Sequence, residues 1–265
     1  MKRLWLFLFL VPILGWGKIY YAKVEPYDSV LLKSSVSGRV LEADINAEGR
    51  LISKKQVIHI DDLLDKANLQ ATKESIVLFE KMLEINREIA SSLSEMVERQ
   101  QEHYKRISKI VTASKTQKDS AYNAYVSAKT QYLGTQEKIA SLKKQLLDTR
   151  YKLAMLEDTI KKKSVVLYRK YLYKLMVKEG DFITRGTPLA RIDDTSRAKL
   201  VFYLESEEVE NIKEKQVYLN DTKTDYHVNK VWRVADEKYI SSYRAEIYID
   251  APKQHFSQLI KIEIK

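Results

Sequence analysis

Residues 69–111 read LQATKESIVLFEKMLEINREIASSLSEMVERQQEHYKRISKIV, and residues 121–160 read AYNAYVSAKTQYLGTQEKIASLKKQLLDTRYKLAMLEDTI. In both stretches apolar residues return every seven positions, which is the spacing of a coiled coil. The first stretch places them at Leu69, Ile76, Leu83, Ala90, Val97, Tyr104 and Val111, with a second row at Phe79, Leu93 and Ile107. The second places them at Tyr125, Tyr132, Ile139, Leu146, Leu153 and Ile160, with partners at Ala121, Ala128, Leu142 and Leu156. Proline is absent between Asp62 and Lys163, which favours long helices.

A polar gap from Thr112 to Lys118 separates the two repeats near their midpoint. Two runs of similar length around such a gap predict an antiparallel α-helical hairpin over residues 63–164, because each arm buries its apolar stripe on the other. An arm of roughly 50 residues would be about 75 Å long. The alternative from the heptads alone is a parallel coiled-coil dimer without a hairpin.

The segments on either side of this region, residues 34–62 and 165–194, resemble each other. Both contain short β-prone runs broken by glycine, and both close on the triplet Ile-Asp-Asp. The matching positions are Glu48, Gly49, Ile52, Ser53 and Lys54 against Glu179, Gly180, Ile183, Thr184 and Arg185. This internal repeat predicts two halves of one small β sandwich, which only an antiparallel hairpin can bring together.

Short strand-like runs also dominate residues 195–265, which predicts a small β barrel. Within it, Ser206 followed by Glu207 and Glu208 predicts a capped helix to about Lys213. Residues 18–33 are expected to be an extended lead segment.

The N-terminal residues 1–17 have the plan of a secretory signal peptide. Lys2 and Arg3 precede an apolar run that ends with Gly15 and Gly17, small residues suited to cleavage. The alternative is an uncleaved membrane anchor that continues through Ile19 to Ala22. Either reading places the rest of the chain outside the cytoplasm.

The composition excludes several classes of chemistry. The net charge of +10 is spread over mixed-sign stretches typical of solvated helix faces, so no nucleic-acid partner is predicted. There is no cysteine, and the four histidines are scattered, so no metal site is expected. The pairs Asp61 with Asp62 and Asp193 with Asp194 are assigned to turns at strand ends rather than to acid–base or calcium chemistry. Phosphate-binding loops and nucleophile motifs are absent, so no enzyme is predicted.

From about Val24 onward the chain resembles the periplasmic adaptor subunits, or membrane fusion proteins, of the haemolysin-secretion (HlyD-like) family of Gram-negative bacteria. The motifs are VSGRV with EGRLISKKQ, EGDFITRGTPLARIDD, and KLVFYLESEEVENIKEKQV. The resemblance implies an elongated α+β fold, in which a long antiparallel coiled-coil hairpin is inserted into a split biotinyl-lipoyl-like β sandwich, followed by a small β barrel. No biotin, lipoate or other cofactor is expected, because the hairpin replaces the turn that would present the modified lysine.

The resemblance also implies a docking site at the hairpin tip. The family often has an arginine, a hydrophobic residue four positions on, a serine seven further, and then an aspartate and an alanine. The corresponding residues here are Ile107, Ser114, Asp119 and Ala121, with His103 at the arginine position and Arg106 one turn away. Ser114 is also expected to cap the second helix.

By this resemblance the protein would link an inner-membrane transporter to a TolC-like outer-membrane channel, in efflux or secretion, and would self-associate into a ring. The long hairpin, and a membrane-proximal domain that is not evident after the barrel segment, favour an ABC transporter over a proton-driven one. The alternative is a structural coiled-coil protein that spans the envelope without a transport partner. An enzyme carrier domain is the third hypothesis.

Overall fold

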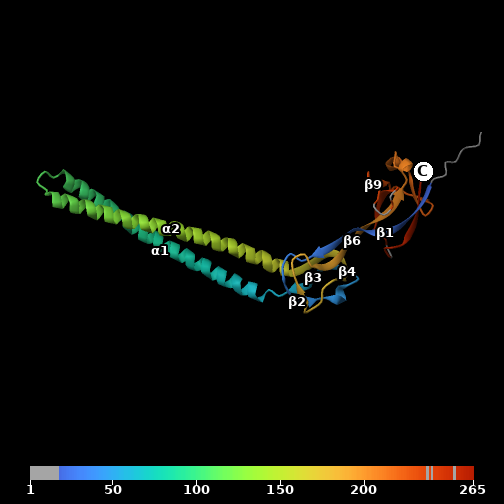
Figure 1. The fold of residues 1–265 in the computed structure, drawn as a ribbon, viewed down its shortest axis with the longest axis horizontal. Coiled ribbons are helices and arrows are strands. Elements are labelled where there is room, and N and C mark those ends of the chain that lie inside the picture. Colours follow the sequence, from blue (N-terminus) through green and yellow to red (C-terminus); the bar gives the residue numbers. More distant parts are fainter. Residues whose placement is uncertain (1–17, 237–238, 240, 253–254) are drawn as a thin grey trace, which may run out of the picture.

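The computed structural model describes residues 18–236, 239, 241–252 and 255–265, so the expected signal peptide lies outside the described residues. Figure 1 shows an elongated α+β molecule in which two long helices extend from one end of a β region. Within the described residues, no helix is long and apolar enough to cross a membrane.

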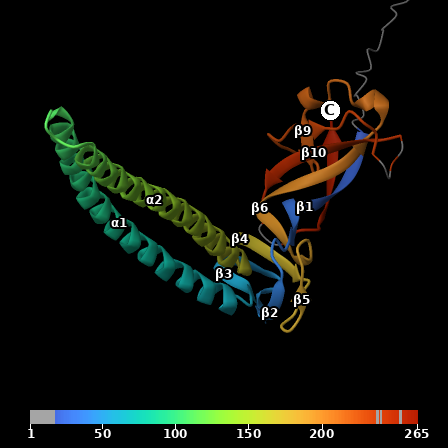
Figure 2. The same cartoon turned by 60° about the vertical axis from the view of Figure 1, so that its left-hand side comes forward.

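The helices α1 (Leu63–Lys109) and α2 (Lys115–Lys163) form the expected antiparallel hairpin within one chain. With 47 and 49 residues, each is about 70 Å long. Figure 2 shows them side by side along most of their length. The seam buries residues of the expected rows, among them Leu83, Ala90, Ile139 and Leu142. The hairpin thus satisfies its own apolar stripe without the parallel partner of the alternative.

Two seam positions on α1 are polar, which the heptad pattern does not anticipate. Thr72 and Asn86 are buried, and each bonds back to a carbonyl four residues earlier: Thr72 Oγ1 to Asn68 at 2.7 Å and Asn86 Nδ2 to Met82 at 2.7 Å. This local bonding satisfies both side chains inside the seam.

The strands of the described residues pair antiparallel in the order β5-β2-β3-β4-β6-β1-β11-β7-β8, with β10 beside β6 and β9 beside β10. Their bounds are β1 (Lys18–Lys33), β2 (Gly38–Ala43), β3 (Arg50–Ile60), β4 (Ser164–Leu175), β5 (Phe182–Ile183), β6 (Pro188–Leu204), β7 (Val217–Leu219), β8 (Thr222–Lys223), β9 (Val228–Val231), β10 (Tyr243–Asp250) and β11 (Leu259–Ile264). A single 3-10 turn, η1 (Ile45–Ala47), precedes β3.

The two repeated segments meet in one hydrophobic core at the base of the hairpin. Ile52 and Ile183, equivalent positions in the repeat, are both buried in it. Gly38 of β2 pairs with Ile183 of β5, and the Val40 amide donates to the Asp181 carbonyl at 2.8 Å. The hairpin therefore brings together segments that lie more than 100 residues apart in the chain.

A second core lies further from the hairpin and is built from β1, β6, β7, β9, β10 and β11. Its fully buried side chains include Phe202, Leu200 and Ile247. β1 pairs with β11 over residues 18–23 and with β6 over residues 23–33. Residues 18–33 are extended but are not a free lead segment, because β1 contributes Ala22 and Val24 to the second core and pairs with β6 as far as Pro188.

β6 also runs through both cores without a break, so the expected division between residues 194 and 195 falls inside a strand. The assignment of Asp193 and Asp194 to a turn at a strand end is wrong for the same reason. Ser29 and Asp28 of β1 pair with these two aspartates and continue the ladder past them.

The helix expected from Ser206 to Lys213 is also wrong. Two 3-10 turns occupy the region, η2 (Ser206–Glu208) and η3 (Ile212–Glu214). Asn211 has a φ of 57°, in the left-handed region that short polar residues tolerate, and this conformation interrupts a helix.

Candidate functional site: the hairpin tip and its two sides

The hairpin tip is the turn of residues 110–114 between α1 and α2. Ser114 caps α2 as expected: its Oγ accepts from the Gln117 amide at 3.3 Å, and its own amide donates to Gln117 Oε1 at 2.9 Å. This reciprocal capping box satisfies two amides that a helix start leaves free. Sequence reasoning predicted Ser114 as the cap but did not single out Gln117, three residues on, which completes the box.

Three tyrosines lie behind the turn and join the two arms. The Tyr104 ring of α1 stacks on Tyr125 of α2, with ring centroids 6.5 Å apart, and contacts Tyr122 at 5.3 Å. Aromatic pairs at these distances add to the attraction of burial alone. The cap and the tyrosines together give the tip a defined shape.

The residues singled out from the sequence do not all face outward. His103, Arg106, Ser114 and Asp119 are exposed, and Ile107 is half-buried. Ala121 is 6% exposed and lies in the seam, so its side chain packs against α1 instead of facing a partner.

Sequence reasoning missed the two apolar residues at the turn itself. Val111 was expected in the buried heptad row, but it is 94% exposed because α1 already ends at Lys109. Ile110 beside it is 44% exposed. The signal that could have found them is the polar gap, since a seam cannot continue past the helix end.

The hairpin has a second feature, an apolar stripe on each of its two flat sides. On α1 the stripe consists of Leu78, Met82, Ile85 and Ile89, each at least 42% exposed. Each of these residues immediately precedes a seam residue of α1. On α2 the stripe is Tyr122, Val126, Leu133 and Leu147, and each residue immediately follows a seam position.

The geometry of antiparallel helices places these stripes on opposite sides. The two helices run in opposite directions, so viewed from one end they wind in opposite senses. Residues that precede the seam therefore lie on the same side of the hairpin on both helices, and residues that follow the seam lie on the other side. The α1 stripe precedes the seam and the α2 stripe follows it. The Arg150–Glu80 ion pair, 2.7 Å long, shows which residues of the two helices lie opposite each other. Both of its residues follow the seam on their own helix, so they mark the side that carries the α2 stripe.

The side with the α2 stripe is hollowed where Leu83, Leu146 and Leu147 meet the ion pair, in a shallow groove of about 460 Å³. The opposite side has an uncharged face on α1. From residue 64 to residue 96, the two rows on that side contain no charged residue: Leu64, Ala71, Leu78, Ile85 and Ser92 in one, and Asn68, Ser75, Met82, Ile89 and Met96 in the other. A solvated helix face normally carries charges, so this face is suited to packing.

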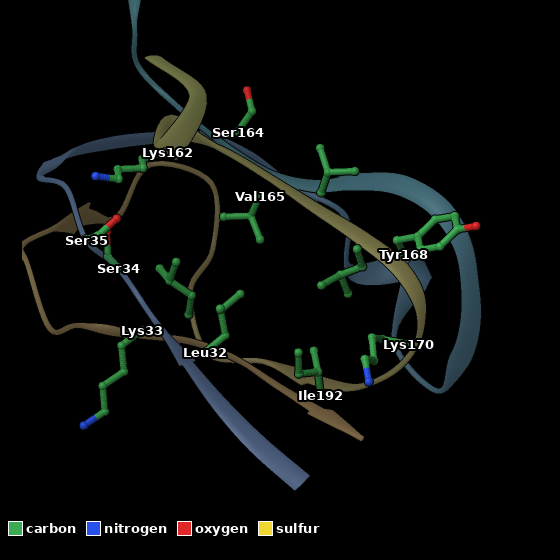
Figure 3. Close-up of a pocket in the computed structure, with 13 residues that line it drawn as sticks. Leu32, Lys33, Ser34, Ser35, Lys162, Ser164, Val165, Tyr168, Lys170 and Ile192 are labelled. Atoms are coloured by element: carbon green, nitrogen blue, oxygen red, sulfur yellow. The ribbon is translucent and has the colours of Figure 1, made fainter. Parts of the chain in front are cut away.

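The β region has two further hollows. Figure 3 shows one of about 360 Å³ at the hairpin base, where Leu32, Val165 and Ile192 face a gap between β1, β4 and β6. The other, about 660 Å³, lies where the two cores meet, and buried Asp193 lines it. In the part of the chain that the structure describes, no group of three or more metal-ligating side chains occurs.

No protein-family model and no curated protein sequence matches the chain. Solved structures do match it. MacA from Actinobacillus actinomycetemcomitans has a TM-score of 0.67 at 14% identity, over 94% of this chain and 79% of that one. A MacA chimera containing the α-hairpin domain of MexA from Pseudomonas aeruginosa gives 0.58 at 16% identity, over 94% and 79%. The membrane fusion protein Spr0693 from Streptococcus pneumoniae R6 gives 0.55 at 9% identity, over 94% and 99%.

These likenesses cover almost the whole chain and include both the β region and the hairpin. The chain therefore has the fold of the membrane fusion proteins, the class to which its sequence motifs pointed. At such low identity the likeness concerns the fold alone.

Proposed function

We propose that the chain is a periplasmic adaptor subunit that links an inner-membrane transporter to a TolC-like outer-membrane channel. The observation that carries the proposal is a long hairpin with a capped tip in a chain whose fold matches MacA and the membrane fusion protein Spr0693, each over 94% of its length. Such a rod suits a mechanical link, because it reaches about 70 Å from its base. The signal-like residues 1–17 support export to the periplasm.

The core at the hairpin base would be the split biotinyl-lipoyl-like sandwich of such adaptors, and the second core their small β barrel. The repeat supports the first assignment. Gly49 and Gly180, equivalent positions, have φ values of 71° and 92° and open the two matching turns. Left-handed φ values of this size favour glycine.

Self-association into a ring is the second part of the proposal. Two different apolar surfaces on opposite sides of one subunit form a head-to-tail contact when copies stand side by side, and such contacts give a ring when the rotation between neighbouring copies closes. The uncharged α1 face of one copy would lie against Leu147 and its groove on the next copy. Packing the stripes would remove from water side chains such as Leu78 and Leu147, which are 63% and 64% exposed.

Docking of the tip to the outer-membrane channel is the third part. The exposed candidates His103, Arg106, Ser114 and Asp119 lie within about two turns of the helix ends, with Ile107 between them. Ser114 combines capping with exposure, so both roles are compatible in one residue.

The test is a cross-link at the tip. The chain contains no cysteine, so Ser114→Cys provides a single attachment point for a short cross-linker in the intact envelope. Recovery of an outer-membrane channel is expected, whereas Ser141→Cys, exposed midway along α2, serves as the matched control and should recover none. Failure to recover a channel would favour the envelope-spanning structural protein.

A further inference from the structure

The hairpin tip and the helix ends beside it combine exposed apolar side chains with cationic side chains that form no ion pair in the part of the chain that the structure describes. Val111 and Ile110 are exposed at its apex. Between residues 105 and 119 there are five cations and one acid: Lys105, Arg106, Lys109, Lys115 and Lys118 against Asp119. Among the described residues, none of these six forms a hydrogen bond or ion pair through its side chain.

Helix stability explains only part of this charge. Arg106 and Lys109 lie in the last turn of α1, where cations interact favourably with the negative end of the helix dipole. Lys115 is the first residue of α2 and Lys118 follows one turn later, at the positive end, and α2 has no acidic residue in its first turn. The lysines at the start of α2 therefore oppose the preference of a helix N-terminus for acidic residues. Such departures from local preference are typical of functional positions.

We propose that the tip binds an anionic protein surface, a carboxylate-lined socket in which Val111 and Ile110 occupy an apolar floor and the lysines pair with the rim. This inference rests on the proposed docking role and adds the chemistry of the partner. A shaped protein socket suits the tip better than a lipid surface, because the capping box and the tyrosines hold the turn in one form. Charged residues at the rim of an interface orient the two proteins and raise their association rate, while the buried apolar contacts supply most of the affinity.

The experiment places a photo-cross-linking amino acid at Val111 of the full-length protein in its native envelope and identifies the joined peptide by mass spectrometry. The expected peptide contains several Asp or Glu residues around the cross-linked position. Lys115→Glu with Lys118→Glu should lower the yield about tenfold or more, because like charges then face each other. Lys138→Glu with Lys144→Glu, two exposed lysines midway along α2, makes the same charge change and should leave the yield unchanged.

Loss of fold cannot mimic this result. Glutamates in the first turns of α2 favour the helix, so the tip variant should melt at the same temperature as the original or higher. A peptide from an outer-membrane channel without acidic residues, or cross-links to lipid alone, would overturn the inference. An acidic peptide from a protein other than a channel would support the inference and refute the channel docking. Absence of any cross-link would refute both.

Discussion

Lys163, the last residue of α2, donates to the carboxylate of Asp65 in the first turn of α1, 98 positions earlier in the chain. The same ammonium group donates to the Asp61 carbonyl at 2.6 Å, and its side chain is 12% exposed. A partly buried ion pair with a second hydrogen bond is stronger than a surface pair. This contact closes the base of the hairpin where both helices leave the β region.

Lys163→Met should therefore destabilise the protein. The change keeps most of the side-chain volume and leaves Asp65 without its cation, at a cost of about 2 kcal/mol. Thermal unfolding followed by helical circular dichroism measures it. Lys162→Met removes a neighbouring exposed pair with Asp158 and should cost less than about 0.5 kcal/mol, so equal losses would contradict the assigned role of Lys163.

Substitution of alanine for two different glycines should change the stability of the protein in opposite directions. A Cβ at Gly38 would lie 2.7 Å from Ile60 Cγ2, inside the core at the hairpin base. Gly38→Ala should therefore destabilise the fold by about 1–3 kcal/mol. Gly134 lies inside α2 with nothing within 4 Å of its Cβ position, so Gly134→Ala should stabilise by about 0.5–1 kcal/mol. Urea denaturation of the two variants tests the pair, and a matching sign would refute it.

Asp194 should make stability depend on pH in the acid range. The Lys170 ammonium, with help from the Ser196 hydroxyl and amide, lowers the pKa of Asp194 from 3.8 to about 2. The pKa of Asp194 is lower in the folded than in the unfolded protein. The contribution of its carboxylate to the free energy of unfolding is therefore complete above about pH 4 and is lost as the pH falls towards 2.

The loss at Asp194 should amount to about 1–2 kcal/mol once solvent screening is allowed for. Between about pH 5 and pH 2 the original protein should lose that much more stability than Asp194→Asn, measured by urea denaturation at each pH. Parallel curves over this range would show that the ion pair with Lys170 contributes nothing.

The two sides of the hairpin should meet when copies assemble. With Ile85→Cys and Leu147→Cys in one chain, oxidation should produce a ladder of covalently linked copies, because these positions lie at similar heights on opposite sides. Val77→Cys with Leu147→Cys is the matched control, since Val77 is 63% exposed on the other side of α1. A ladder from the control but not from the test pair would refute the proposed packing.

The long helices and most C-terminal strands could be predicted because their signals are local. The heptads placed Leu83 and Ile139 in the seam, where both are buried, and Leu259–Ile264 is one of the strands found in the region 195–265 where strand-like runs were expected. β1 was harder to predict from the sequence, because Pro26 and Asp28 are residue types typical of loops. Proline is tolerated there because the ladder has a bulge between these two residues, and the partners of β1 in β11 lie about 240 residues away.

The tip was only partly predictable. The capping role of Ser114 was expected from its place before the second helix, and the structure adds Gln117, whose side chain completes the capping box. The exposure of Val111 depends on where α1 ends, and helix ends are less certain than helix interiors because they fray and vary by one or two residues. Its heptad position therefore misled the interpretation.

β6 runs unbroken through both cores, and β1 is paired with it from Lys23 to Lys33, which has a mechanical consequence. A twist or pull applied to the helices would travel through the base core as tension in two continuous backbones, braced by the hydrogen bonds between them. No flexible linker separates the two cores along this route, so the β region should respond to force as one rigid unit and not as two independently moving domains.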